Sequence, residues 1–209
     1  MDVPSPANPN RTFSKKSPEV RRQELIEATL RCMSSIGTEE ISVRHIAREA
    51  NLSLGMVRHH FNSKDELLAA TLRHLSDQHN VQTGLALAAA GPDPGARLRA
   101  FILACLHPGT METAYVRARF QFFSLAQTNA TVREVHDEIY ANFERKIRTL
   151  LTDVATSKKV DMDVEDVTLA ITALLKGIWV EWSLTPGRAD PQRLAGQILR
   201  MLPGWSGED

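Results

Sequence analysis

Cysteine is scarce in this chain, which has only Cys32 and Cys105 in 209 residues. Both lie among apolar residues of predicted helices, a setting that indicates buried thiols in a reducing compartment rather than a disulfide framework. Aromatic residues are also few, at 6% of the chain, and the formal net charge is zero. The composition therefore excludes a disulfide-stapled secreted domain and gives no global sign of a nucleic-acid partner.

Long apolar runs are missing as well. Residues 1–10 contain no apolar stretch of the kind found in a signal peptide. The most apolar segment, residues 167–182, is interrupted by Lys176 and Glu181. We therefore expect no membrane-spanning helix and no membrane partner, and we predict a cytoplasmic protein.

The motifs of common enzyme classes do not occur. There is no Gly-rich phosphate loop and no nucleophile elbow. His45, His59 and His60 are close in sequence, but no cysteine or carboxylate completes a metal-ligand set at a usual spacing. The sequence thus predicts a protein that is not an enzyme, with no catalytic residue, no metal and no cofactor.

The most informative stretch is residues 42–64, which read SVRHIAREANLSLGMVRHHFNSK. Its spacing predicts two short helices, one after Ser42 and one after Ser53, because both serines suit the N-cap position. Asn51 and Leu52 form the turn between them. Ala47 stands where the two helices cross, and only a small side chain allows them to approach. This pattern is typical of a DNA-binding helix-turn-helix.

The second helix of this pair divides into two faces. Val57 and the following Phe61 face inward, whereas Leu54, Arg58 and His59 face outward. Such a helix enters the major groove of duplex DNA with its exposed residues against the base edges. Arg58 can donate two hydrogen bonds to a guanine, and Leu54 can contact a thymine methyl group.

Charge around this stretch is uneven although the whole chain is neutral. Residues 11–64 hold ten Lys and Arg against six Glu, and the remainder has a matching acidic excess. A local basic patch suits reversible, salt-sensitive binding to DNA. Arg44 is placed for a phosphate or a groove edge, and the alternative is that the excess is only a solvated face.

The string LSLGMVRHHFNSKDELL resembles the signature of TetR-family repressors, and the likeness covers about the first 75 residues. Asn51 stands where many members have Gly, and Arg58 where many have Tyr or Ser, so the base preference is expected to be the chain's own. Together, the resemblance and the placement of Arg44 give these predicted DNA contacts: Val43, Arg44, Ser53, Leu54, Gly55, Arg58, His59 and Lys64.

The rest of the chain predicts an all-α protein with no strand. Residues 1–16 are expected to be a disordered basic arm, which either reaches a minor groove or only solubilises the protein. Residues 17–63 form the three-helix helix-turn-helix domain, with its first helix ended by Gly37. Residues 64–209 form a helical bundle for effector binding and dimerisation, in which two short helices occupy about 112–127.

The helix expected over residues 164–184 is apolar over so wide an arc that two of its sides must be buried. Its segment Leu174-Leu175-Lys176-Gly177-Ile178-Trp179, with the following Pro186-Gly187, is similar to the C-terminal domain of the choline-responsive BetI group. In TetR-like proteins two helices from each of two subunits form a four-helix dimer interface. In this chain they correspond to residues 131–155 and 164–184. A buried central helix in a monomer is the alternative.

The aromatic residues of the second domain suggest an effector pocket between helices. Aromatic faces beside a carboxylate suit a cationic or quaternary ammonium ligand, with His107 as a further polar group. The predicted effector residues are Tyr115, Phe120, Phe123, Trp179, Glu181 and Trp182. The function predicted is a dimeric repressor released from operator DNA by a small molecule. Its alternatives are a regulator of this fold without an effector and a helical protein-interaction adaptor.

Overall fold

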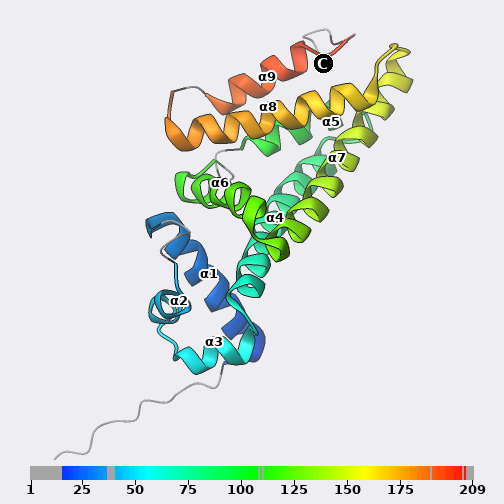
Figure 1. Cartoon of the computed structure of the whole chain (residues 1–209). Coiled ribbons are helices and arrows are strands. Elements are labelled where there is room, and N and C mark those ends of the chain that lie inside the picture. The colour runs from blue at the N-terminus through cyan, green and yellow to red at the C-terminus, as the bar shows by residue number, and fades with distance from the viewer. Residues whose placement is uncertain are drawn as a thin grey trace, which may run out of the picture.

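The computed structural model describes residues 16–36, 41–107, 109, 111–188, 190–203 and 205. In that part of the chain all regular structure is helical (Figure 1). The helices are α1 (Pro18–Ile36), α2 (Val43–Glu49), α3 (Leu54–His60), α4 (Lys64–Ala89), α5 (Pro94–Cys105), α6 (Thr113–Thr128), α7 (Ala130–Lys158), α8 (Val164–Leu184) and α9 (Pro191–Arg200). The predicted arm lies outside the described residues except for Lys16, and so does Gly37.

Side-chain caps explain why most of these helices begin where they do. Ser42, Ser53 and Ser63 each accept a hydrogen bond from the backbone N–H three residues later. Asp93 and Asp163 do the same for α5 and α8. Each cap satisfies an amide that has no partner inside its helix, so the starts of these helices follow from local sequence.

The interior consists of two clusters of buried apolar side chains. One joins α1, α2 and α3 to the first half of α4, and it also includes Phe122 of α6 and Val132 of α7. The other lies between α5, α7, α8 and α9 and contains Phe101 and Leu175. The helix-turn-helix therefore shares its core with α6 and α7 and is packed firmly against the bundle.

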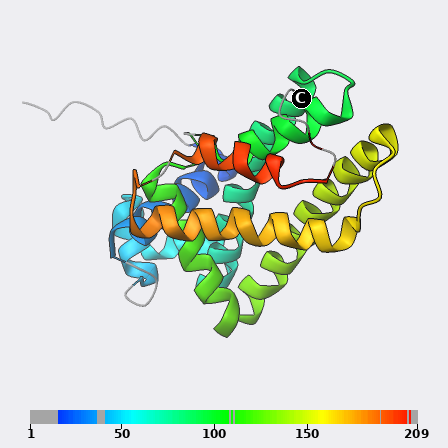
Figure 2. The ribbon, with the colours of Figure 1, turned by 90° about the horizontal axis from the view of Figure 1, so that it is seen from above.

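The helices are arranged along one long axis (Figure 1). α1, α2 and α3 lie at one end, α4 and α7 run side by side through the middle, and α8 and α9 lie together at the other end. The view from above shows α8 crossing over α6 and α7 (Figure 2). The prediction of two short helices over residues 112–127 was wrong, since one continuous helix, α6, occupies this region.

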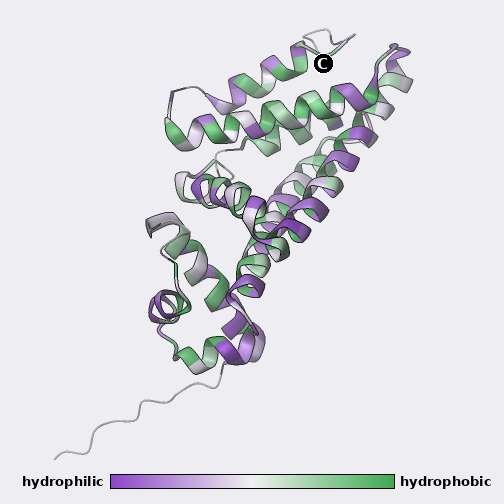
Figure 3. Ribbon diagram, viewed as in Figure 1, coloured by the Kyte–Doolittle hydropathy of each residue, from purple (hydrophilic) through white to green (hydrophobic). Residues whose placement is uncertain are grey.

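α7 carries more hydrophilic residues than α8 (Figure 3), and the two helices also differ in the side chains that they expose. The apolar side of α7 is in the core, and its outer positions are mostly charged or polar. α8 instead carries an exposed stripe of apolar and small residues that also includes large side chains, with Leu169 57% and Leu174 40% exposed. The members of this α8 stripe are Leu169, Ala170, Ala173, Leu174 and Gly177.

Among the described helices, α8 alone is long and apolar enough to span a membrane, as judged by length and composition only. Its side away from the stripe is buried against the protein, with Leu175 and Trp179 at 0% and 3% exposure. α8 therefore has an exposed apolar stripe on one side, whereas none of the exposed large apolar side chains in the described residues belongs to α7.

Candidate DNA interface and effector cavity

α3 has the two faces that its sequence predicts. Val57 and the C-capping Phe61 are 3% and 2% exposed. Arg58 and His59 are exposed on the opposite side, and Leu54 is half-buried. Asn51 in the preceding turn has φ of 53°, the left-handed conformation that Asn tolerates better than most residues. The turn therefore holds α3 against α2 with its polar face open.

The other predicted DNA contacts surround this face. Ser53 and Gly55 at the start of α3 are exposed, as is Arg44 near the start of α2. Val43 is half-buried against the core, and Lys64 is half-buried at the first position of α4. The structure thus leaves these residues accessible around one helix.

Residues of α1 contact the C-terminal end of α3. Arg22 donates a hydrogen bond to the carbonyl oxygen of His60, and its guanidinium lies 4.1 Å from the centroid of the Phe61 ring. Burial, His59 and Arg22 together lower the pKa of His60. Arg22 was not among the residues predicted from the sequence, because a contact 38 residues away leaves no local signal.

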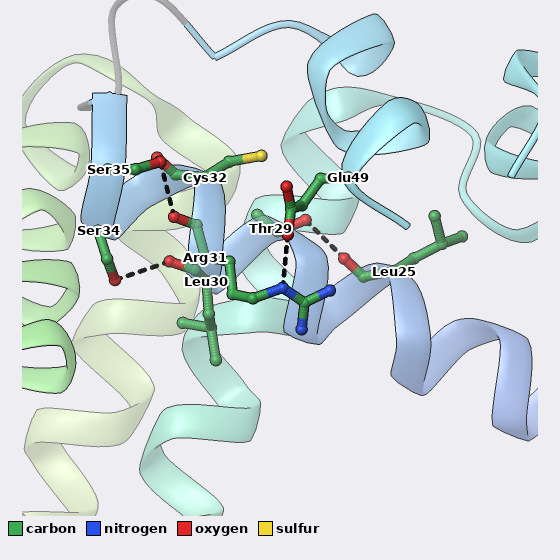
Figure 4. A network of polar contacts seen from close by, with 8 residues as sticks. All are labelled: Leu25, Thr29, Leu30, Arg31, Cys32, Ser34, Ser35 and Glu49. Carbon is green, nitrogen blue, oxygen red and sulfur yellow. Dashed lines mark hydrogen bonds and ion pairs between the residues drawn. The ribbon is translucent and has the colours of Figure 1, made fainter. Parts of the chain in front are cut away.

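A second link joins α1 to α2. Arg31 Nε donates to Glu49 Oε1 over 2.7 Å, as Figure 4 shows. Glu24 is paired with Lys16 and Arg21 in a similar way. These contacts neutralise two of the carboxylates near the helix-turn-helix, whereas Arg44, Arg58 and Lys64 have no ion pair within the described residues. The surface charge beside α3 is therefore positive.

The start of α4 follows directly from α3. Ser63 Oγ accepts from the Glu66 amide at 3.0 Å, as in a capping box. Glu66 departs from that motif because its carboxylate accepts from Asn62 instead of Ser63. Three consecutive residues join α3 to α4, and two of them, Asn62 and Ser63, bond to Glu66 in the first turn of α4. The position of α3 is therefore coupled to that of α4.

The predicted effector residues do not form one pocket. Glu181 is exposed and ion-paired with Arg188 at 2.6 Å, and it lines an open groove on α8 together with Trp182. Phe120 is 41% exposed. His107, the further polar candidate, is exposed. The predicted combination of aromatic faces with the Glu181 carboxylate is therefore not assembled.

A smaller group does meet inside the bundle. Trp179 is buried and donates its indole N–H to the Cys105 carbonyl at 3.3 Å. The Tyr115 hydroxyl donates to the Leu75 carbonyl at 2.7 Å. Phe123 lies 5.7 Å from the ring of Tyr140. These rings surround a region that the sequence analysis recognised only in part.

The residue between these rings is Arg119 of α6, which is 8% exposed. Its guanidinium lies 4.5 Å from the Trp179 ring and donates to the Tyr115 hydroxyl at 3.3 Å. Next to it, a cavity of about 140 Å³ opens between α4 and α7. Its lining includes Arg119, His79, Tyr140 and Phe143.

His79 on the α4 side of this cavity is 4% exposed. Burial, with Arg119 and Lys146 adding to it, holds the pKa of His79 well below its usual range. Burial also raises the pKa of the nearby Cys105 thiol to about 12. Both groups are therefore neutral at physiological pH, and Arg119 is the charged group at the inner end of the cavity.

Two models of protein families match the chain. Residues 25–71 match bacterial regulatory proteins of the tetR family, and residues 94–204 match the C-terminal domain of BetI-type transcriptional repressors. This chain belongs to the TetR family, in its BetI-type group. Members of the family are DNA-binding transcriptional regulators and not enzymes, so this chain is a sequence-specific DNA-binding regulator of transcription.

Individual TetR relatives agree with this assignment. The HTH-type transcriptional regulators BetI of Burkholderia thailandensis and Burkholderia ambifaria are each 29% identical over 88% of this chain and 94% of their own. A transcriptional regulator from Pseudomonas aeruginosa PAO1 has the same fold with a TM-score of 0.82, at 28% identity over 90% of this chain and 91% of its own.

One further solved structure with the TetR fold contains a ligand. It is a transcriptional regulator from Saccharomonospora viridis in complex with choline, with a TM-score of 0.76 and 17% identity. The match covers 88% of this chain and 98% of that one. At this identity the likeness concerns the fold alone.

Proposed function

We propose that the protein is a cytoplasmic homodimer that represses transcription by holding two copies of α3 in adjacent major grooves. The observation that carries this proposal is the exposed polar face of α3, with Arg58 at its centre, on a rigid three-helix core. Two recognition helices of a dimer reach half-sites on one side of the duplex when they lie about 34–36 Å apart.

Within this proposal Arg58 reads a base pair and its neighbours hold the backbone. The exposed guanidinium of Arg58 has no ion pair in the described residues, so it is free to donate to a guanine. Arg44 and Lys64 lie on either side and can neutralise phosphates. The remaining proposed contacts are Val43, Ser53, Leu54, Gly55 and His59.

The dimer is proposed to form through α8, with α9 beside it. The α8 stripe combines large exposed leucines with Ala170, Ala173 and Gly177, which would let a second helix approach closely. Exposed apolar residues that adjoin one another on a helix surface mark an interaction site. The sequence prediction that residues 131–155 also take part stays a prediction, and we place the apolar centre of the interface on α8 because the outer side of α7 is polar.

An effector bound in the bundle has two physical routes to the DNA-binding helices. α4 carries Lys64 at its start and His79 at the cavity, about 22 Å apart at 1.5 Å per helical residue. α6, which carries Arg119, contacts α1 directly: Gln121 donates to the Met33 carbonyl at 2.8 Å. A ligand that favours one arrangement of α4 and α6 would therefore change the spacing of the recognition helices.

The effector is proposed to be small. The choline in the Saccharomonospora viridis relative is consistent with the cationic ligand that the sequence analysis predicted, although Glu181 is not available in this chain to receive a cation there.

Selection from a random duplex library tests the proposed function. The purified protein should enrich a two-fold symmetric sequence, and its affinity should fall steeply between 50 and 200 mM salt, by about 10³-fold or more for six phosphate contacts. The Arg44→Ala, Arg58→Ala double variant should lose this enrichment, whereas Arg133→Ala, an exposed position on α7, should keep it. If the protein binds duplex DNA only weakly and its binding does not change with salt, the result would instead indicate the helical protein-interaction adaptor.

A further inference from the structure

Arg119 is a buried cation without a counter-charge. Within the described residues, the groups that act on it electrostatically are Tyr115, Tyr140 and Cys105, and no carboxylate is among them. Its described contacts are the Tyr115 hydroxyl, the rings of Tyr115 and Trp179, and a hydrogen bond with the Tyr140 side chain. An arginine remains charged in proteins, and a buried charge is costly unless an opposite charge meets it. The free protein therefore holds an unsatisfied positive charge at its centre.

The surroundings add to this charge instead of cancelling it. Lys146 reaches toward α4, with Nζ 3.4 Å from Asn80 Oδ1. Lys176 of α8 lies 4.0 Å from the Tyr140 ring. The carboxylates on the cavity lining, Asp77 and Glu138, are both exposed and therefore lie at its mouth. Among the residues that line the cavity, Arg119 is the buried charged group, and the other charged groups, Arg73, Asp77 and Glu138, are exposed at the rim.

A second polar group at the inner end also lacks a partner. The Nδ1 atom of His79 is buried and has no hydrogen bond, while Nε2 faces the Cys105 sulfur at 3.7 Å. Buried polar atoms in folded proteins are normally hydrogen-bonded. A neutral imidazole can place its proton on Nδ1 and donate it to a ligand oxygen.

We propose that the effector of this regulator is a small organic anion, most simply a monocarboxylate, whose negative group pairs with Arg119 and accepts from His79. The inference rests on the proposed function in so far as the same cavity is the effector site. A volume of about 140 Å³ is close to that of an engineered cavity that admits benzene, which limits the ligand to roughly a benzoate or a short-chain acid. The rings of Phe143 and Tyr140 would hold its apolar part.

The proposal reverses the sign of charge expected from the aromatic residues alone. Tyr115 and Trp179 already hold a cation, the guanidinium of Arg119, against their faces. A quaternary ammonium ligand in this cavity would meet that guanidinium, and the carboxylates of the lining, Asp77 and Glu138, lie only at the rim. Choline is therefore the informative comparison.

Thermal denaturation without DNA tests the ligand separately from the operator. The wild-type protein is titrated with acetate, butyrate, benzoate and inorganic phosphate, and with benzamide and choline as neutral and cationic comparisons. At least one carboxylate should raise the melting temperature, and choline and benzamide should not. Arg119→Met should weaken the affinity for that carboxylate about 30-fold or more, the usual loss when one partner of a buried charge pair is removed.

Matched variants separate the role of Arg119 from a structural one. Arg117→Met changes an exposed arginine on the same helix and should leave binding unchanged. Without ligand, Arg119→Met should melt no lower than the wild type, since it removes an uncompensated charge. Glu138→Gln, which removes a carboxylate from the rim and releases Arg73 from its 2.7 Å ion pair, should strengthen anion binding about two- to five-fold.

Three results would overturn the proposal: no anion in the panel binds, Arg119→Met binds the carboxylate as well as the wild type does, or choline alone stabilises the protein. If Arg119→Met fails to fold, Arg119→Lys and Glu138→Gln test the proposal by whether each variant weakens or strengthens carboxylate binding. A protein that binds a carboxylate but enriches no duplex would refute the proposed function and leave the anion site standing.

Discussion

The strongest consequence of the α8 stripe is that one substitution on it should dissociate the protein, whereas a matched one on α7 should not. Leu174→Arg inserts a long charged side chain into the stripe, beside Ala173 and Gly177. Ala141→Arg makes the same insertion at an exposed small residue of α7. The comparison decides which helix forms the dimer.

The expected magnitude comes from the exposure of Leu174. Burying a whole leucine stabilises by about 1.5–3 kcal/mol, and Leu174 has 40% of its surface left to bury. Loss of this leucine in both protomers thus lowers the free energy of dimerisation by about 2 kcal/mol in magnitude. Two unpaired guanidiniums in an apolar interface cost several kcal/mol more, so the dimerisation constant should fall by about three orders of magnitude or more.

Sedimentation equilibrium over a range of concentrations measures this change directly. Leu174→Arg should sediment as a folded monomer with the helix content of the wild type, and Ala141→Arg as a dimer. The monomer should also bind its operator far more weakly, because it engages one half-site at a time. The reasoning fails if Leu174→Arg remains a dimer, or if Ala141→Arg dissociates.

Three further predictions concern other parts of the molecule. Arg58→Ala should cost about 1–3 kcal/mol of operator affinity and relax the preference at one base pair, which a competition assay with operator variants measures. Arg22→Met should weaken operator binding by about 1–2 kcal/mol through loss of the hydrogen bond that holds the end of α3, without changing the preferred sequence in the same assay. Because the folded-state pKa of His79 is lowered, its contribution to stability should be complete above about pH 6.5 and be lost as the pH falls below that value. Urea denaturation from pH 7.5 to 5 should show this loss in the wild type, and His79→Gln should reduce it.

Local chemistry explains why much of the fold was predictable. Ser42, Ser53 and Ser63 each cap a helix with the adjacent amides, and Asn51 adopts the left-handed turn, so these features need only neighbouring residues. The period of Val57 and Phe61 likewise indicates the buried side of α3. Over residues 42–64, pattern and structure therefore agree closely.

The proposed effector site was harder to predict because it depends on which residues meet across the bundle. Arg117 and Arg119 are two positions apart in the same helix, yet one is exposed and the other is 8% exposed. Nothing local separates them. Glu181 and Trp179 are similarly close in sequence, but they face an open groove and the interior respectively. Only the packing of α4, α6, α7 and α8 assigns each to a side.

The shared core described above limits how this regulator can be taken apart. Phe122, Ala118 and Val132 complete the apolar cluster beneath α1, so a fragment ending at residue 63 would leave that surface uncovered and should aggregate. Chimeras that graft these DNA-reading helices onto another regulator would have to carry the matching faces of α6 and α7. The preference for an operator sequence could then be transferred between relatives only together with the parts of α6 and α7 that pack against the DNA-binding helices.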